Sequence, residues 1–100
     1  MKFEVALDQD ALADLGVLRA YDRKTVLDMI ERVLTTTPTQ ISKSRIKRLR
    51  GLDSPQYRLR VGSFRVFYDV TDTEVYVMRV LSKAAVAEYL TEMAYEIEDD

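Results

Sequence analysis

The chain has 100 residues, of which 47% are hydrophobic and 32% charged, a balance typical of one compact globular domain. It contains no cysteine and no histidine, which excludes disulfide bonds, thiolate nucleophiles, Ser-His triads and zinc sites built on these residues. No apolar run exceeds four residues, whereas a transmembrane helix needs about 20. We therefore expect a single cytoplasmic domain over residues 1–100, with no secretory signal, cofactor or metal site.

The formal net charge of −2 arises from two stretches of opposite sign. Residues 41–65 hold eight Lys or Arg side chains against one acid, Asp53, which gives a net charge of +7. Residues 84–100 hold six acids and no base, which gives −6. A local basic field attracts phosphate even when the whole chain is acidic, although the two stretches could also simply neutralise each other.

The first part of the chain predicts a strand followed by two helices. Residues 3–7 alternate loosely between apolar and polar side chains, as a short strand does. Asp8 is expected to cap one helix and Asp22 a second, with only Ala20 and Tyr21 joining them as an antiparallel hairpin. The apolar faces expected to be buried are formed by Leu12, Leu15 and Leu18 in the first helix and by Val26, Leu27, Ile30, Val33 and Leu34 in the second.

The second part of the chain changes to a period of two. Residues 39–56 show no clear period and are expected to form a basic loop. Residues 57–61 and 64–70 alternate as strands, and Gly62-Ser63 between them is expected to form a type II′ hairpin turn. Residues 75–81 predict the last strand.

Ser82 is expected to cap a C-terminal helix that has one apolar side. The resulting order is β-α-α-β-β-β-α, which predicts an α+β fold. We expect the helical hairpin and the C-terminal helix to pack on one face of a mainly antiparallel, four-stranded sheet. The apolar side of the C-terminal helix contains Val86, Tyr89, Leu90, Met93 and Ile97.

Three arginines are expected to converge on one sheet surface. Side chains alternate along a strand, so Arg58 and Arg60 point away from the helical hairpin, and the two-residue turn places Arg65 opposite Arg60. Three like charges destabilise each other unless an anion intervenes, and Asp69 is the only acid on these two strands. The pattern favours binding of phosphate or of an acidic peptide over internally paired arginines.

The segments KRLRGL (residues 47–52) and YRLRVGSFRVFYDV (residues 57–70) resemble the signature of the RelE/ParE superfamily of bacterial toxins. Upstream, Asp14-Leu15 and Tyr21-Asp22-Arg23 are similar to its helical hairpin, and Arg79-Val80 is similar to its last strand. The resemblance covers essentially the whole chain and is strongest over residues 47–70. It implies a RelE-like fold and the toxin component of a type II toxin–antitoxin system, with a cognate antitoxin as partner.

RelE-like members of the superfamily bind the ribosomal A site and cut mRNA without metal, which implies a ribosome-dependent mRNA endoribonuclease that inhibits translation. The basic residues expected to bind RNA are Lys43, Arg45, Lys47, Arg48 and Arg50. Carried over by position, the catalytic set of the family falls on Arg58, Arg60, Arg65, Lys83 and Tyr89.

Part of the family pattern near the C-terminus is missing. Leu81 stands where a glycine is usual, and Ser82 and Ala84 stand where further basic residues occur. Two alternatives therefore remain: a ParE-like, non-enzymatic inhibitor of DNA gyrase, and a degraded homologue that only binds its antitoxin. For Tyr89 the alternative to catalysis is packing on the apolar side of its helix. For Lys83 the alternative is solvent exposure at the helix start.

Overall fold

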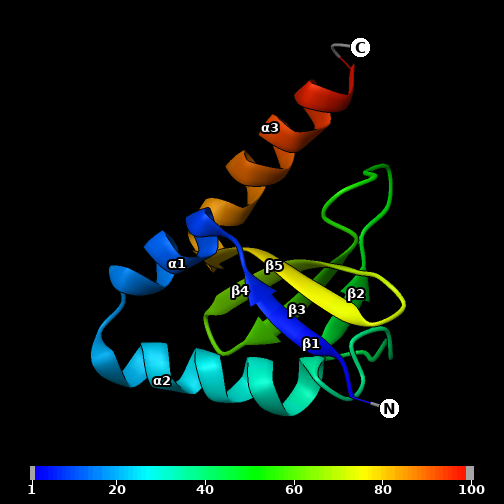
Figure 1. Cartoon of the computed structure of the whole chain (residues 1–100). Helices are drawn as coiled ribbons and strands as arrows, with labels where there is room; N and C mark the ends of the chain where they lie inside the picture. Colours follow the sequence, from blue (N-terminus) through cyan, green and yellow to red (C-terminus); the bar gives the residue numbers. More distant parts are fainter. Residues whose placement is uncertain (1, 99–100) are drawn as a thin grey trace.

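The computed structural model describes residues 2–98, and for residues 95–98 it describes the backbone alone. A five-residue π-helical turn extends α2, and a short 3-10 turn precedes α3 (Figure 1). No helix among the described residues is long and apolar enough to cross a bilayer. The elements in chain order are β1 (Glu4–Leu7), α1 (Gln9–Gly16), α2 (Ala20–Met29), β2 (Ile46–Arg48), β3 (Tyr57–Val61), β4 (Phe64–Val70), β5 (Glu74–Ser82) and α3 (Val86–Glu98).

The strands form one mixed sheet in the order β1-β5-β4-β3-β2, in which β1 runs parallel to β5 and all other neighbours are antiparallel. The predicted α+β class is confirmed, and the sheet has five strands rather than four. The additional strand, β2, lies in the segment that was expected to be a loop. Ile46 of β2 pairs with Leu59 and is buried, but three residues are too few to show a period in the sequence.

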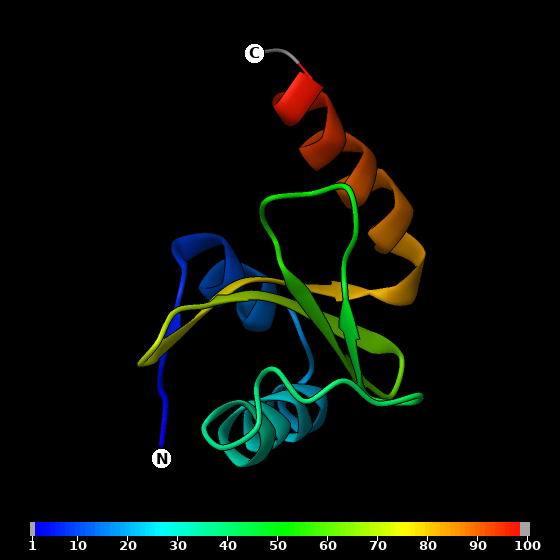
Figure 2. The same ribbon diagram turned by 90° about the vertical axis from the view of Figure 1, so that its right-hand side faces the viewer.

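The helices cover both faces of the sheet, which corrects the expectation that all of them share one face. Figure 2 shows α2 below the sheet and α3 above it. On β4, Val66 and Tyr68 belong to a core cluster with the buried residues of α1 and α2. Phe67, between them in sequence, belongs to a second cluster with Leu81 and Tyr89 of the α3 side. Because strand side chains alternate, these clusters lie on opposite faces.

Most of the predicted helical faces are buried, with two exceptions. Leu12 is 54% exposed because Ala11 and Leu15, four residues apart, form the buried face of α1. Leu27 is likewise exposed, whereas Val33 and Leu18 pack against the core. On the other side of the sheet, Val86, Leu90 and Met93 of α3 pack around the second cluster. The remaining buried residues of α2 and its extension are Val26, Ile30 and Leu34.

An arginine closes the helical hairpin. The connection between α1 and α2 is residues 17–19, so α2 starts earlier than predicted and Asp22 lies in its first turn instead of capping it. The guanidinium of Arg23 donates hydrogen bonds to the carbonyl oxygens of Leu15 (2.9 Å) and Leu18 (2.7 Å). The Leu15 carbonyl oxygen also accepts from the Leu18 backbone N–H (3.2 Å), so Arg23 adds one donor at the C-terminal end of α1 and another in the connection.

Tyr68 ties the centre of the sheet to the segment after α2. Its hydroxyl donates a 2.6 Å hydrogen bond to the carbonyl oxygen of Pro38, and its ring stacks on Tyr57 with centroids 5.5 Å apart. Burial raises the pKa of Tyr68 above its ordinary value. The neutral phenol is therefore the form that the folded state stabilises.

We predict that Tyr68→Phe lowers the free energy of unfolding by about 1 kcal/mol at pH 8, because one buried hydrogen bond is lost. In the unmodified chain, stability should also fall as the pH rises past about 10, since the unfolded phenol ionises there while the folded one stays neutral. Tyr68→Phe removes that ionisation, so urea titrations should show a smaller gap between the two proteins at pH 11. An equal gap at both pH values would contradict this account.

Candidate functional site

The hairpin of β3 and β4 brings three arginines onto the α3 face of the sheet. Arg60 lies directly opposite Arg65, as the two-residue turn predicts, and Arg58 lies opposite Phe67. Gly62 has a φ of +58°, and a type II′ turn requires such a positive φ at its first central position. The expected convergence of the three arginines is therefore confirmed.

No acid neutralises this arginine cluster (Arg58, Arg60 and Arg65) among the side chains that the structure describes. Asp69, the acid on β4, instead accepts hydrogen bonds from the Ser54 hydroxyl (2.5 Å) and the Gln56 backbone N–H (2.7 Å). The pKa of Arg58 is lowered, first by burial and then by the positive charges of Arg65 and Arg60. Like charges held together without a counter-ion create a local positive potential that attracts anions.

The three arginines are not equivalent. Arg65 is only 8% exposed, and its Nη1 donates to the carbonyl oxygens of Gly62 (2.8 Å) and Phe64 (2.9 Å), so it also holds the hairpin turn. Arg58 is half-buried, and its Nε is buried with no hydrogen-bond partner in the described part of the chain. Arg60 is exposed. Arg58 and Arg60 are therefore the cations available to a ligand.

The five residues predicted to bind RNA are all exposed and lie in or next to the edge strand β2: Lys43, Arg45, Lys47, Arg48 and Arg50. Lys47 lies opposite Arg58 and extends the arginine cluster on the α3 face. The guanidinium of Arg48 lies 4.9 Å from the ring centroid of Tyr57, on the other face. The side chain of Arg45 also reaches the other face, where it contacts a methionine of α2. The basic surface therefore runs around the sheet edge.

Lys83 and Tyr89 occupy different surroundings. Lys83 is exposed, and its backbone N–H donates to the carbonyl oxygen of Ser63 (2.9 Å), beside the hairpin turn that joins Arg60 to Arg65. Tyr89 is 6% exposed, with its ring 5.1 Å from that of Phe67. Its hydroxyl oxygen is buried as well. The structure thus places Lys83 beside the arginine cluster and Tyr89 in the second core cluster.

Two residues without a role in the sequence-based site, Asp14 and Arg79, form the surroundings of Tyr89. The Arg79 guanidinium lies 5.5 Å from the Tyr89 ring centroid and binds both carboxylate oxygens of Asp14, at 2.8 and 3.0 Å. The hydrogen bond to Asp14 raises the pKa of Arg79. Both residues lie in segments that resemble the family. Because they are far apart in the sequence, the sequence alone does not indicate that they form an ion pair, which joins α1 to β5.

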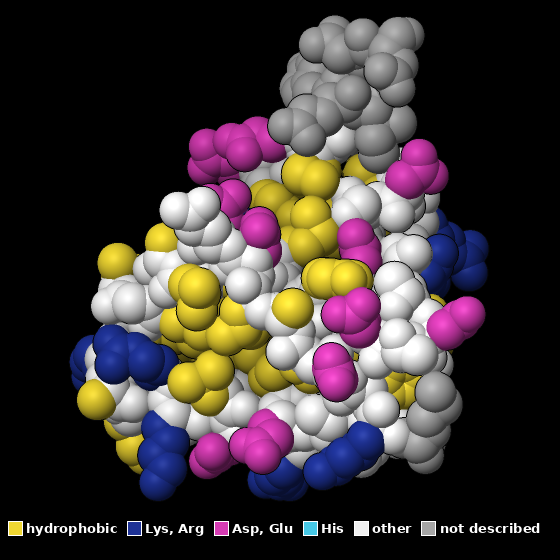
Figure 3. Space-filling view, in the orientation of Figure 1, with side chains coloured by type: hydrophobic (Ala, Val, Ile, Leu, Met, Phe, Trp, Pro, Cys, Tyr) yellow, Lys and Arg dark blue, Asp and Glu magenta, His cyan; other side chains and the backbone are white. Residues whose placement is uncertain are grey.

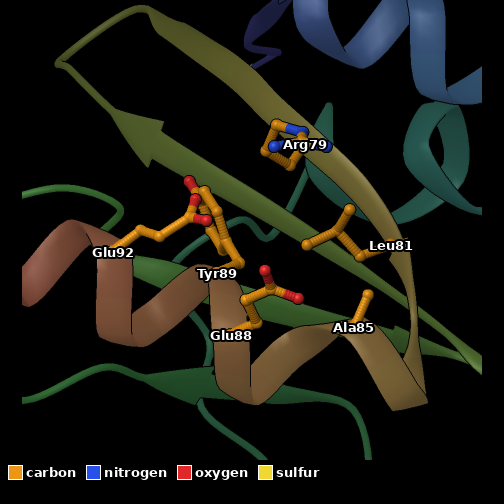
Figure 4. Close-up of a pocket in the computed structure, with 6 residues that line it drawn as sticks. All are labelled: Arg79, Leu81, Ala85, Glu88, Tyr89 and Glu92. Atoms are coloured by element: carbon orange, nitrogen blue, oxygen red, sulfur yellow. The ribbon is translucent and has the colours of Figure 1, made fainter.

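Figure 4 shows the pocket beside this pair, in which Tyr89 lies between Arg79 and Glu92. The pocket has a volume of about 210 Å³. It has acidic side chains, and its one arginine is already neutralised by Asp14, so it does not suit an anion. Its lining consists of Arg79, Leu81, Ala85, Glu88, Tyr89 and Glu92. In the space-filling view of Figure 3, acidic side chains likewise gather near the start of α3.

The fold and the arginine cluster define a small α+β protein with a basic sheet face that no described acid neutralises. The family described as "ParE toxin of type II toxin-antitoxin system, parDE" matches residues 5–86. The chain belongs to the RelE/ParE superfamily of toxins of type II toxin–antitoxin systems.

A protein of Methanocaldococcus jannaschii named "Putative toxin RelE1" is 39% identical to the chain over 84 residues, which is 83% of this chain and 91% of that protein. Among solved structures, the RelBE2 toxin–antitoxin complex of Mycobacterium tuberculosis aligns with a TM-score of 0.69 at 24% identity, covering 82% of this chain and 99% of that one. A mutant of the Escherichia coli toxin RelE in the free state aligns with a TM-score of 0.56 at 19% identity, over 96% and 97% of the two chains. These structures show the same fold.

We predict that the three arginines differ in their contribution to stability. Arg65→Ala should lower the free energy of unfolding by about 1–3 kcal/mol, because two carbonyl oxygens of the hairpin lose a charged donor. Arg58→Ala and Arg60→Ala should change it by no more than about 0.5 kcal/mol, since each also relieves repulsion. Urea denaturation of the three variants measures the difference. Equal losses for all three would show that the hydrogen bonds of Arg65 do not stabilise the turn.

Proposed function

We propose that this chain is a toxin that cleaves mRNA on the ribosome, with the arginine cluster as its RNA-backbone site. The single observation that carries the proposal is the convergence of three guanidiniums on one sheet face without a described carboxylate in ion-pair contact. A guanidinium fork can hold two phosphate oxygens at once, so RNA supplies the missing negative charge.

Metal-free cleavage requires activation of the 2′-hydroxyl, protonation of the leaving 5′-oxygen and stabilisation of the phosphorane charge. Arg58 and Arg60 suit the stabilisation of charge, which often contributes more to the rate of such reactions than any other effect. Lys83 lies beside the hairpin and is the candidate for donating a proton or binding the leaving oxygen. Tyr89 is the candidate base, and because its hydroxyl is buried, this role requires α3 to expose it on the ribosome.

A cognate antitoxin is the proposed protein partner. The structures of similar fold include toxin–antitoxin complexes from Mycobacterium tuberculosis and Methanococcus jannaschii, and a RelE–RelB complex from Pyrococcus horikoshii. A partner that presents acidic groups to Arg58 and Arg60 would relieve their repulsion and block access of RNA at the same time.

A second candidate function is inhibition of DNA gyrase without enzymatic activity. Two observations favour it: the family matched by residues 5–86 is described as the ParE toxin, and Tyr89 is packed against Phe67 and Arg79. Leu81, at a position where the family resemblance leads us to expect glycine, is buried with Phe67 and Tyr89 in the second core cluster, which also favours this candidate.

The proposal predicts that the purified chain cuts mRNA only when the message is bound to ribosomes. Arg58→Ala should lower the cleavage rate about 10²- to 10³-fold, because one stabilising cation of the transition state is lost. Arg32→Ala, an exposed arginine in the extension of α2, serves as the matched control and should cleave at the parental rate. Primer extension on a defined message measures the cut.

The same assay tests Tyr89. If Tyr89 is the base, Tyr89→Phe should lower cleavage about 10²- to 10⁴-fold with little change in stability. Cleavage at the parental rate would assign Tyr89 to packing alone. Absence of any ribosome-dependent cut, together with inhibition of supercoiling by purified gyrase, would replace the proposal with the gyrase function.

A further inference from the structure

A cavity of about 400 Å³ opens between the chain that follows α2 and the turn that precedes β2. Figure 2 shows that this chain passes along α2, below the sheet. Ile46, which lines the cavity, belongs to the core cluster shared with α1 and α2, so the cavity lies on the opposite face from the arginine cluster. The lining residues are Val33, Thr37, Gln40, Ser42, Ser44, Arg45 and Ile46.

The turn that forms one wall is held in place before any ligand binds. The Ser42 hydroxyl oxygen accepts hydrogen bonds from the backbone N–H groups of Arg45 (3.0 Å) and Ile46 (3.2 Å). The Ser42 backbone N–H in turn donates to the carbonyl oxygen of Ile46 (3.0 Å). Gln40 and Ser44 are exposed, so an amide and a hydroxyl line a preformed opening.

Arg45 is the one charged residue that lines the cavity among those the structure describes, and it precedes the edge strand β2. The backbone N–H of Arg60 donates to the carbonyl oxygen of Arg45 (2.8 Å), so these residues face each other across the strands. Their side chains diverge, because the Arg45 guanidinium lies 3.7 Å from the Met29 sulfur on the α2 side. Residues 35–52 contain no acid that would repel phosphate. Arg60 and Arg45 lie at the same edge of the sheet, with their side chains on opposite faces.

We propose that this cavity binds one nucleotide of the RNA, next to the nucleotide whose phosphate the arginine cluster holds. Arg45 pairs with a phosphate, and the Gln40 amide and Ser44 hydroxyl bind the 2′-hydroxyl or the base edge. Val33 provides an apolar wall for the base. The inference rests on the proposed function, since it assigns a second subsite for the same RNA.

The test measures binding of a fluorescent single-stranded hexaribonucleotide to the purified chain at one salt concentration. Gln40→Ala changes no charge and should weaken binding about 3- to 10-fold through loss of a hydrogen bond. Arg45→Gln should weaken it about tenfold or more, because a charged contact is lost. Lys24→Gln removes the same charge from the exposed side of α2 and should change binding less than twofold. Thermal melting of each variant confirms that it is folded.

Arg58→Ala separates this inference from the function on which it rests. One outcome rejects the cavity alone. In it, Arg58→Ala weakens binding, Gln40→Ala has no effect, and Arg45→Gln binds the oligonucleotide as well as the control Lys24→Gln does. The cavity is then not a subsite, and the assignment of the arginine cluster to RNA binding is retained. If Arg58→Ala leaves binding unchanged, the RNA assignment itself fails and the inference falls with it. Losses in Gln40→Ala, Arg45→Gln and Arg58→Ala, with none in Lys24→Gln, support both.

Discussion

The burial of both faces of β4 determines the rest of this structure. Val66 and Tyr68 face the helical hairpin, and Phe67 faces α3, so one strand contributes to two separate hydrophobic clusters. A helix must therefore cover each face, and α3 has to pack on the side opposite α1 and α2. The alternation also places Arg65 on the α3 face beside Phe67, with Arg58 and Arg60 on the neighbouring strand. The positions of the three arginines thus follow from the division of the hydrophobic core into two clusters, one on each face of the sheet.

The arginine cluster illustrates a conflict between stability and function. Arg65 gains hydrogen bonds to two carbonyl oxygens, whereas Arg58 has a buried Nε without a partner among the described residues and a lowered pKa. Asp69 could have reduced this repulsion, but it binds Ser54 and the backbone of the preceding loop. The positive charge of the cluster therefore stays unneutralised by described side chains, and Asp69 instead holds the loop before β3 in place.

The sequence predicted those elements whose segments are long enough to show a clear hydrophobic period. The alternation around Leu59 and the turn at Gly62 determine the hairpin, its register and the arginine convergence, all of which the structure confirms. Two features could not be predicted from the sequence. β2 has only three residues, and the face chosen by α3 depends on Phe67, whose neighbours in sequence are also apolar. The pairing of Asp14 with Arg79 is long-range, so no local pattern reveals it.

Binding of the RNA backbone by the unneutralised arginines, as proposed above, is tested most directly by the salt dependence of binding. Binding of a single-stranded oligoribonucleotide should weaken linearly on a logarithmic salt scale, with a slope of about 0.7 for each phosphate neutralised. Replacing both Arg58 and Arg60 by alanine should reduce that slope by about 1.4, twice the value for one contact, while the chain stays folded. A slope unchanged in the folded double variant would contradict the assignment of this sheet face to RNA.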